Sequence, residues 1–169
     1  MYKRIIGQKS LLVPLTEADI DKVAAWAHDP IICNNYYNCV SMEETNLRKC
    51  IESPKDNKNV FIINTIDNVT IGKLSLEIMD DNSAMVDMVI GEKIYTGKGF
   101  GKDDLKDILK YCFEEKNLDS VKMIMKEDNM RAEYCCWSCG LREDKYYIPD
   151  DTMKGTARMV IFKKDYIGY

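Results

Sequence analysis

Short stretches of alternating apolar and polar residues recur along this chain of 169 residues. A period of two is typical of β-strands, because successive side chains point to opposite faces of a sheet. Turn-forming residues at 67–68 and 80–83 separate several of these stretches. The pattern predicts strands over residues 11–15, 60–65, 70–79, 84–91, 120–126 and 157–162, and it places Tyr146 and Tyr147 in a further strand.

Other segments repeat apolar residues with the period of an α-helix. The clearest stripe starts at Leu105 and continues to Phe113, with charged residues on the remaining faces. Two earlier helices follow capping boxes at 16–19 and 41–44; the first helix stops before Pro30, and a polar loop covers 34–38. A last helix follows Asn129 and ends near Gly140. This order predicts one mixed α/β domain over residues 1–169, with helices on both faces of the sheet.

Three glycines at alternate positions precede the helix that contains Leu105. They lie in the run Tyr95-Thr96-Gly97-Lys98-Gly99-Phe100-Gly101-Lys102. Glycine reaches positive φ and allows close approach of the backbone, and a helix N-terminus offers free N–H donors. The run therefore predicts a phosphate or pyrophosphate site. It fails the Walker A pattern, because Glu92 stands where the first glycine is required, and its spacing G-x-G-x-G fails the dinucleotide fingerprint.

The glycine run resembles the acetyl-CoA loop of the GNAT superfamily of N-acetyltransferases, (Gln/Arg)-x-x-Gly-x-Gly/Ala. Thr96, Gly99 and Gly101 take its three marked positions, with threonine replacing the usual Gln or Arg. Asn129 and Ala132 match an Asn-x-x-Ala motif of the superfamily. The opening segment is most similar to the branches that contain ribosomal-protein, spermidine and aminoglycoside 6′-N-acetyltransferases. The resemblance covers nearly the whole chain.

This resemblance implies a mixed, mostly antiparallel sheet of six or seven strands, with about four helices on both faces. It implies direct transfer of an acetyl group from acetyl-CoA, as co-substrate and without a metal, to a primary amine. The acceptor would be a small cationic amine, such as a polyamine or an aminoglycoside, or a protein N-terminus. The residues expected to bind acetyl-CoA are Met88, Val89, Ile90, Thr96, Gly97, Lys98, Gly99, Phe100, Gly101, Lys102 and Asn129.

Candidate residues for the chemistry follow from the same resemblance. A protonated amine has a pKa near ~10, so a base must remove a proton before nitrogen can attack. Asp87, ten residues before Gly97, is the candidate base, since aminoglycoside acetyltransferases have an aspartate at the corresponding distance; the alternative is a solvent-facing strand residue. Cys136 stands where many GNAT enzymes have a tyrosine thought to protonate the departing thiolate. Tyr36, Tyr37 and Glu77 are expected to shape the acceptor pocket.

Several residues have a structural interpretation beside the functional one. Asn129 either binds the cofactor arm or only caps the last helix. His28, the single histidine, is expected to complement a helix end, and Trp26 is expected in the core.

Composition excludes some classes of function. The net charge of −4 argues against a nucleic-acid partner. No run approaches the ~20 apolar residues of a membrane helix, and the N-terminus does not resemble a secretory signal, so a cytoplasmic protein without membrane contact is expected. The family often forms homodimers, which is one assembly that the resemblance allows.

Seven cysteines raise the question of a disulfide set or a metal site. Cys135, Cys136 and Cys139 continue an apolar helical stripe, and Cys33, Cys39, Cys50 and Cys112 are scattered. Free cysteine packs as a small buried hydrophobe, so core packing is expected. Two alternatives to the enzyme stay open: an acyl-CoA-binding protein without catalysis, and a redox or zinc protein built on Cys136-Trp-Ser-Cys139.

Overall fold

The computed structural model, which describes residues 4–169, contains one eight-stranded sheet. Its strands follow the order β1-β2-β3-β4-β5-β6-β8-β7. Within the described residues, β5 and β6 are parallel, and every other neighbouring pair is antiparallel. The strands are β1 (Ile5–Ile6), β2 (Ser10–Pro14), β3 (Lys58–Thr65), β4 (Thr70–Ile78), β5 (Ser83–Ile90), β6 (Ser120–Lys126), β7 (Arg142–Glu143) and β8 (Thr156–Phe162).

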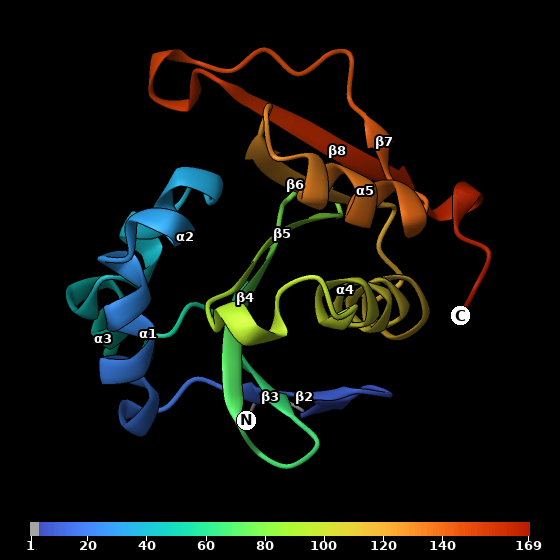
Figure 1. The fold of residues 1–169 in the computed structure, drawn as a ribbon. Coiled ribbons are helices and arrows are strands. Elements are labelled where there is room, and N and C mark those ends of the chain that lie inside the picture. The colour runs from blue at the N-terminus through green and yellow to red at the C-terminus, as the bar shows by residue number, and fades with distance from the viewer. Residues whose placement is uncertain (1–3) are drawn as a thin grey trace.

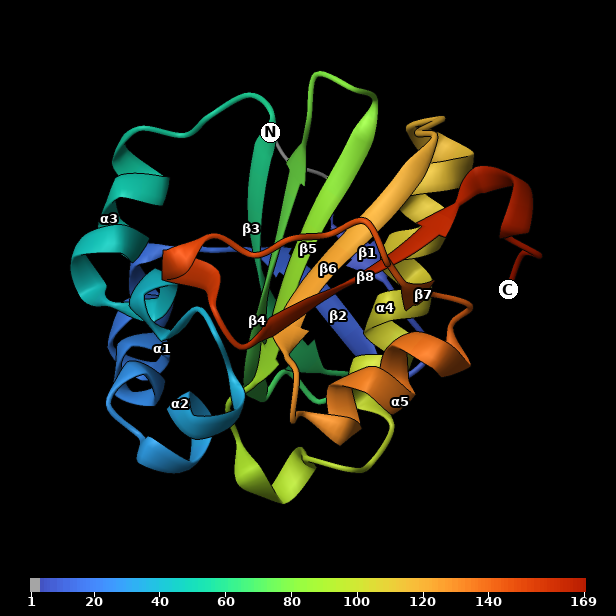
Figure 2. The same cartoon turned by 90° about the horizontal axis from the view of Figure 1, so that it is seen from above.

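Helices cover both faces of this sheet (Figures 1 and 2). Helices α1, α2 and α3 group on one side of β4 and β5, and α4 and α5 lie on the other side. Helix α4 continues into a π-helical turn over Tyr111–Glu115. The helices are α1 (Ile20–Ala27), α2 (Pro30–Asn35), α3 (Glu44–Glu52), α4 (Phe100–Lys110) and α5 (Met130–Ser138).

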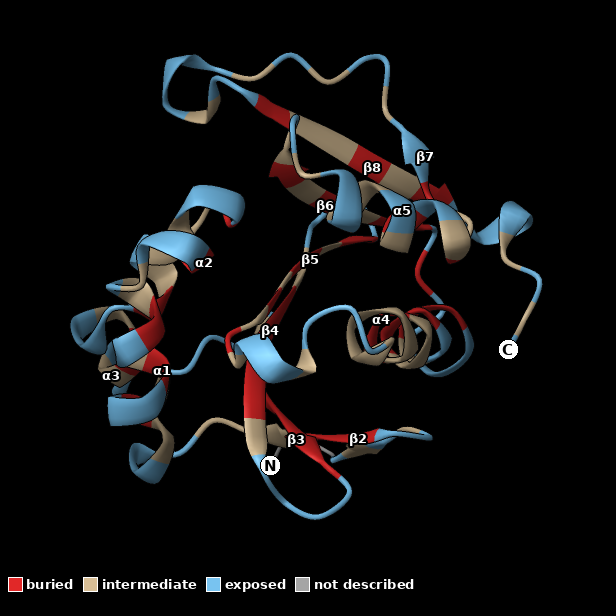
Figure 3. Cartoon of the chain, in the orientation of Figure 1, coloured by how far each residue is buried: buried red, intermediate tan, exposed pale blue. Residues whose placement is uncertain are grey.

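Two hydrophobic clusters hold these layers together. One joins the sheet to α4 and α5 and includes Leu74, Val86 and Leu105. The other joins the opposite face to α1–α3 and includes Val23 and Ile62. Figure 3 shows this distribution, with buried residues along β4 and β5 and exposed residues on the outer sides of the helices. The alternating strand pattern and the helical stripes point into these two clusters, as their periods predict.

The fold class predicted from the sequence is confirmed, and the element counts need correction. Residues 4–169 form eight strands and five α-helices, against six or seven strands and about four helices predicted. The additional strands β1 and β7 have two residues each, which is too short to produce an alternating pattern. The additional helix α2 begins at Pro30, where Asp29 caps it by accepting the Ile31 N–H at 2.9 Å. Proline is well suited to a first helical position, so the helix stop at Pro30 is also a helix start.

Two local predictions are wrong. Tyr146 and Tyr147 do not lie in a strand: they follow β7 in a turn, where the Tyr147 N–H donates to the Asp144 carbonyl at 3.0 Å. The box at 41–44 does not form either, because Ser41 Oγ donates to the Asn38 carbonyl at 2.7 Å and α3 begins later, after Glu43. In each case a local hydrogen bond competes with the predicted element: the Asp144 carbonyl accepts from Tyr147, and the Asn38 carbonyl accepts from Ser41.

Trp26 takes the core position expected for it. It is 5% exposed, and its indole lies against the backbone of Gly91 just beyond the end of β5. A Cβ at Gly91 would come within 2.1 Å of Trp26 Cδ2, so only glycine allows this approach. The contact fixes α1 against the strand end that leads to the glycine run. No helix within residues 4–169 is long and apolar enough to cross a membrane.

Candidate active site

A cleft of about 740 Å³ opens between the far ends of β5 and β6. Within the described residues, the pairing of these two strands stops at Val86 and Met123, although both strands continue for several residues. The cleft is therefore walled by strand edges that no neighbouring strand occupies. Its other walls come from α2 and the residues after it, from the segment 93–102 and from the first two turns of α5.

The residues predicted to bind acetyl-CoA lie together in this cleft, with one exception. All of them line it except Lys98, whose ammonium lies 5.7 Å from the centre of the Tyr95 ring. The Lys98 carbonyl accepts a hydrogen bond from Lys9 Nζ at 3.3 Å, and Lys9 also lies 3.6 Å from Asp103 Oδ2. These contacts tie the glycine run and the first turn of α4 to Lys9, the residue directly before β2.

The glycine run forms the entry of α4. Gly97 and Gly99 have φ values of 77° and 88°, in the left-handed region that favours glycine. Asp103 is the first residue of α4 whose N–H makes a helical hydrogen bond: it donates to the Gly99 carbonyl at 3.1 Å. The preceding N–H groups of the first turn are therefore available as donors, and they lie at the positive end of the helix dipole. This arrangement fits the pyrophosphate of acetyl-CoA.

The end of β5 offers a second set of backbone groups. Met88, Val89 and Ile90 pair with β4 on one side, opposite Leu74, Lys73 and Gly72. On the side of β6 they line the cleft instead of pairing. A strand edge of this kind presents N–H and C=O groups in the extended spacing that an amide-containing chain can match. The pantetheine arm of acetyl-CoA has such amides, so this edge fits it.

Asn129 serves as a cap in the structure. Its Oδ1 accepts the Ala132 N–H at 3.1 Å, and its Nδ2 donates to the Asn35 carbonyl at 2.9 Å. Lys126 Nζ donates to the carbonyls of Cys33 and Asn34 at 2.9 and 3.0 Å. These two side chains, from the junction of β6 and α5, bridge the cleft and hold the C-terminal carbonyls of α2, where cations and donors are favoured.

Asp87 lies behind the wall of the cleft, in a buried polar network. It is 5% exposed and does not line the cleft, so it is not the solvent-facing strand residue of the alternative interpretation. Its Oδ2 accepts hydrogen bonds from the Tyr36 hydroxyl and from Asn38 Nδ2, the latter at 3.1 Å, and lies 3.9 Å from Lys73 Nζ. Lys73 Nζ in turn donates to Ser41 Oγ at 3.1 Å.

The predicted acceptor residues separate into two groups. Tyr36 and Tyr37 line the cleft, and burial together with the Asp87 charge raises the pKa of both phenols above the ordinary value. Both hydroxyls therefore stay protonated at neutral pH. Glu77 lies elsewhere, outside the lining of the cleft, with its carboxylate 3.1 Å from Lys58 Nζ. His28 is an exposed residue at the C-terminal end of α1 and is also outside the cleft lining.

Cys136 lines the cleft from α5 and is only 2% exposed. Burial raises the pKa of its thiol to about 12. Cys139 is fully buried in the same hydrophobic cluster, as the apolar stripe predicts. Of the tyrosines near this position, Tyr134 lines the cleft, whereas Tyr147 lines a smaller cavity beside β8. No group of three or more His, Cys, Asp or Glu side chains that could hold a metal occurs within residues 4–169.

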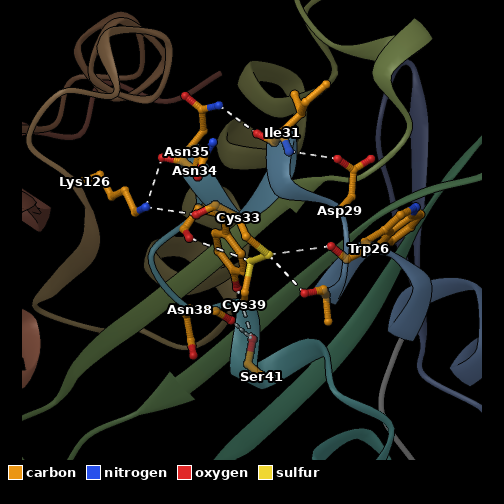
Figure 4. Close-up of a disulfide and its surroundings, with 12 residues drawn as sticks. Trp26, Asp29, Ile31, Cys33, Asn34, Asn35, Asn38, Cys39, Ser41 and Lys126 are labelled. Atoms are coloured by element: carbon orange, nitrogen blue, oxygen red, sulfur yellow. Dashed lines mark hydrogen bonds between the residues drawn. A yellow bond between two sulfur atoms is a disulfide. The ribbon is translucent and has the colours of Figure 1, made fainter.

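The sequence did not predict that Cys33 and Cys39 form a disulfide (Figure 4). Their Cα atoms are 5.7 Å apart, because α2 ends at Asn35 and the chain turns back at once. The bond closes the short segment that carries Tyr36 and Tyr37 into the cleft. Two cysteines six residues apart were a usable signal, but their pairing depends on the helix that begins at Pro30.

Lys73, Asn38 and Ser41 are the other residues that sequence reasoning missed. Lys73 carried a signal, since it is a lysine in the middle of a predicted strand, next to Leu74. Asn38 and Ser41 lie between α2 and α3, with Ser41 in the 3-10 turn Cys39–Met42, which no periodic pattern specifies. All three belong to the network around Asp87.

Comparison with known proteins gives this site a family. The model of the acetyltransferase (GNAT) domain matches residues 9–142. A comparison with curated protein sequences found no match.

Solved structures share the fold. A spermidine N-acetyltransferase from Vibrio cholerae, in complex with CoA and spermine, is 19% identical with a TM-score of 0.78, over 95% of this chain and 99% of that one. A GNAT-family acetyltransferase from Bacillus anthracis is 16% identical with a TM-score of 0.79, over 96% and 99% of the two chains. A Vibrio cholerae protein assigned as a ribosomal-protein-serine acetyltransferase is 15% identical with a TM-score of 0.73, over 95% and 97%.

These identities establish the fold, and the family model covers most of the chain, including the glycine run and both walls of the cleft. The chain therefore belongs to the GNAT family of acetyltransferases, and it is an N-acetyltransferase whose acetyl donor is acetyl-CoA.

Proposed function

We propose that the acceptor is a small cationic primary amine and that Asp87 receives the proton that this amine loses. The observation that carries the proposal is the buried Asp87 carboxylate directly behind Tyr36, a residue of the cleft wall. A spermidine N-acetyltransferase among the proteins of the same fold supports this class of acceptor.

The aromatic side of the cleft suits a cation. The rings of Tyr36 and Tyr37 are 5.8 Å apart in an edge-to-face arrangement at one end of the cleft. An ammonium group over such rings gains about 0.5–2 kcal/mol, depending on how fully it is desolvated. The negative charge of Asp87 adds to this attraction, since the site around it excludes water.

The remaining residues have distinct tasks in transfer. The first-turn N–H groups of α4 bind the pyrophosphate, and the free edge of β5 at Met88–Ile90 orients the thioester and polarises its carbonyl. Acetyl-CoA supplies an activated carbonyl and a thiolate leaving group. A thiol with a reference pKa near ~8.5 leaves without assistance from a strong acid. Asp87 takes up the proton that the attacking amine releases.

The test is a CoA-release assay with a panel of polyamines, aminoglycosides and peptides with a free N-terminus, run on the wild-type chain and on Asp87→Asn. Loss of a general base typically lowers the rate 10²–10⁴-fold. We expect a fall in kcat of at least about 100-fold, with the thermal shift produced by acetyl-CoA unchanged. Asp81→Asn is the matched control, because that exposed carboxylate pairs with Lys122 at the opposite end of β5. Full activity of Asp87→Asn would refute the base assignment.

Cys136 occupies the position of the acid tyrosine, and burial raises the pKa of its thiol to about 12, above the ordinary value of ~10 for a tyrosine. It is therefore a poorer general acid than that tyrosine. If the leaving group needs no acid, Cys136→Ala retains the wild-type kcat and its pH profile.

A further inference from the structure

We propose that Lys73 is a positioning residue for acetyl transfer: it holds the Asp87 carboxylate ionised behind Tyr36, whose hydroxyl relays the proton from the amine in the cleft to Asp87. This inference rests on the proposed function of Asp87 as the final proton acceptor. It adds two residues to that function: Tyr36, which touches the amine, and Lys73, which does not.

Lys73 and Asp87 are paired by the sheet. Val89 on β5 lies opposite Lys73 on β4, and Asp87 lies two residues earlier, opposite Ser75. Side chains at this diagonal share one face of an antiparallel pair. Lys73 Nζ lies 3.9 Å from Asp87 Oδ2, and the two side chains are 3% and 7% exposed. The ladder therefore fixes the contact, and neither residue can turn to water.

Burial makes each charge depend on the other. An isolated carboxylate or ammonium is strongly destabilised away from water, so a buried ion loses its charge unless an opposite charge and hydrogen bonds compensate. Three donors face Asp87 Oδ2: the Tyr36 hydroxyl, Asn38 Nδ2 and the Lys73 ammonium. Lys73 is the only one of the three that carries a positive charge. Without Lys73, Asp87 would lose the group that favours its ionised form.

Tyr36 connects this pair to the cleft. Asp87 does not line the cleft, whereas Tyr36 does, and the Tyr36 hydroxyl donates to Asp87 Oδ2. Burial, assisted by the Asp87 charge, raises the pKa of Tyr36 well above its ordinary value, so its phenol stays protonated and does not act as a base itself. It can pass a proton only if it gives up its own at the same time.

The relay balances as follows. One N–H bond of the ammonium breaks as its proton moves to the Tyr36 oxygen, and the Tyr36 O–H bond breaks as its proton moves to Asp87 Oδ2. The nitrogen keeps the electron pair with which it attacks the thioester carbonyl, and Asp87 becomes neutral. As the C–S bond breaks, the nitrogen gives a second proton to the departing thiolate, which leaves the amide and the CoA thiol. The reverse path returns the proton to solvent after the product leaves. Asp87 Oδ1 is buried without a hydrogen-bond partner among the described residues, so the contacts that hold the carboxylate are all made through Oδ2.

Other titratable groups around Lys73 do not replace Asp87 as its partner. Burial lowers the pKa of Lys73, and the largest opposing influence is the Asp87 charge, ahead of the Cys50 thiol from α3. Lys58 on β3 acts in the same direction as burial. Tyr37, on the cleft side, faces Asp87 with a raised pKa and carries no charge at neutral pH. Asp87 is therefore the charged group that most strongly opposes the effect of burial on Lys73.

The experiment compares Lys73→Met with Lys122→Met in the full chain. Lys122 is a suitable control, because its Nζ also contacts an aspartate and a serine, Asp81 and Ser83, at 3.0 Å each and far from the cleft. For Lys73→Met we expect the acidic limb of kcat/KM to move to higher pH by about one unit or more, which lowers kcat/KM about 10-fold at a pH on the wild-type acidic limb. The thermal shift with acetyl-CoA stays that of the wild type. Lys122→Met keeps both the rate and the profile.

Tyr36→Phe keeps the ring in the cleft wall and removes the relay hydroxyl. We expect kcat to fall at least 10-fold while KM for the amine changes less than threefold. If Lys73→Met does not unfold cooperatively, Tyr36→Phe still tests the proton relay. A wild-type kcat in Tyr36→Phe overturns the relay, and a loss of kcat confirms it. Ser41→Ala then tests Lys73, since it keeps the charge and removes a hydroxyl that contacts Lys73 Nζ at 3.1 Å and the Tyr36 hydroxyl at 3.3 Å. The acidic limb of kcat/KM for Ser41→Ala should stay at its wild-type pH. A shift would contradict the role of the Lys73 charge.

The outcomes separate this inference from the proposed function. If Asp87→Asn is fully active, the base assignment fails and the role of Lys73 fails with it. If Asp87→Asn is inactive while Lys73→Met keeps the wild-type pH profile, Asp87 remains the base and only the positioning role is wrong. In the Asp87→Asn background, Lys73→Met should produce no further loss of kcat, because residues of one network are not additive.

Discussion

Cys33 and Cys39 form a disulfide across the segment that brings Tyr36 and Asn38 to Asp87. The disulfide therefore fastens one wall of the cleft at the point where two donors reach a buried carboxylate. Acceptors for the reduced state are in place as well, since Cys33 Sγ lies 3.2 Å from the Ala27 carbonyl and Cys39 Sγ lies 3.9 Å from the Tyr36 carbonyl. Figure 4 shows the surrounding contacts of α2 with Lys126 and Asp29, which do not depend on the disulfide.

Opening this disulfide should weaken acceptor binding more than cofactor binding. A dithiol reductant opens it by exchange, giving two thiols on the chain and a disulfide on the reductant. Closing so short a segment restricts the unfolded chain, and its loss should lower the free energy of unfolding by about 2 kcal/mol. We expect the Cys33→Ser/Cys39→Ser variant to raise KM for the amine several-fold and to leave KM for acetyl-CoA unchanged. Steady-state kinetics with each substrate varied in turn measures both constants.

Cys50→Ser is the control for this prediction, because Cys50 is a free, half-buried thiol on α3. It should leave both KM values unchanged. Equal changes in the two KM values of the double variant would show that the disulfide supports the whole domain and not the acceptor wall alone.

The glycine run should respond differently at Gly99 and Gly101. Gly99 has a φ of 88°, which a residue with a Cβ adopts at a cost of roughly 1–2 kcal/mol, so Gly99→Ala should lower the free energy of unfolding by about that amount. A Cβ at Gly101 would lie 3.5 Å from Met88 Cε, an ordinary contact, so Gly101→Ala should leave stability nearly unchanged. The same Cβ lies in the cleft wall beside the free N–H donors.

Gly101→Ala should therefore weaken the binding of acetyl-CoA without lowering the free energy of unfolding. Urea unfolding without ligand and thermal shift with acetyl-CoA, measured on both variants, separate the two effects. A stable Gly101→Ala protein with an undiminished acetyl-CoA shift would mean that the run is a turn and not a pyrophosphate site.

Asp104 should make stability depend on pH. It is fully buried on α4, and burial raises the pKa of its carboxyl to about 7, with additional contributions from the charges of Asp107 and Asp103 and an opposing hydrogen bond from Ser10. A carboxyl whose pKa is raised by folding binds more protons in the folded state than in the unfolded state. The contribution of Asp104 to the free energy of unfolding is therefore fully present below pH 4 and is lost as the pH rises to about 7 and beyond.

Asp104→Asn should remove this dependence. The amide keeps an oxygen that can accept from Ser10 and has no charge to bury, so the variant should gain on the order of a few kcal/mol at pH 8 relative to the wild type. Urea unfolding at pH 5, 6, 7 and 8 should give a flatter curve for the variant than for the wild-type chain. Parallel curves would show that Asp104 does not titrate in this range. Asp119→Asn is the control on the exposed surface.

Local periodicity predicted most of the fold, and the exceptions have local causes. The strand at 120–126 was predicted with its observed bounds, and the stripe from Leu105 is the buried face of α4. The strand at Tyr146–Tyr147 was wrong, because β-forming side chains lie there in a turn that Asp144 closes. The two-residue strands at the sheet edges left no pattern at all.

The candidate site was predicted in part. The residues assigned to acetyl-CoA are close in sequence, in two short segments and one cap, and the structure brings all but Lys98 to the cleft. Asp87 was singled out by the resemblance to aminoglycoside acetyltransferases, which have an aspartate at this distance from the glycine run, while Lys73 and Asn38 were not. These partners come from β4 and from the loop after α2, and the contacts depend on register and on loop conformation rather than on sequence spacing.

The sequence by itself determined the longer elements, their order and the glycine run, because hydrophobic period, capping residues and positive φ act within a few residues. The tertiary structure decided three further features: the divergence of β5 from β6, the disulfide beside the cleft and the burial of Asp87 with Lys73. Each of these depends on how segments far apart in the chain are brought together. Burial then makes such contacts strong, because an ion away from water needs its partner.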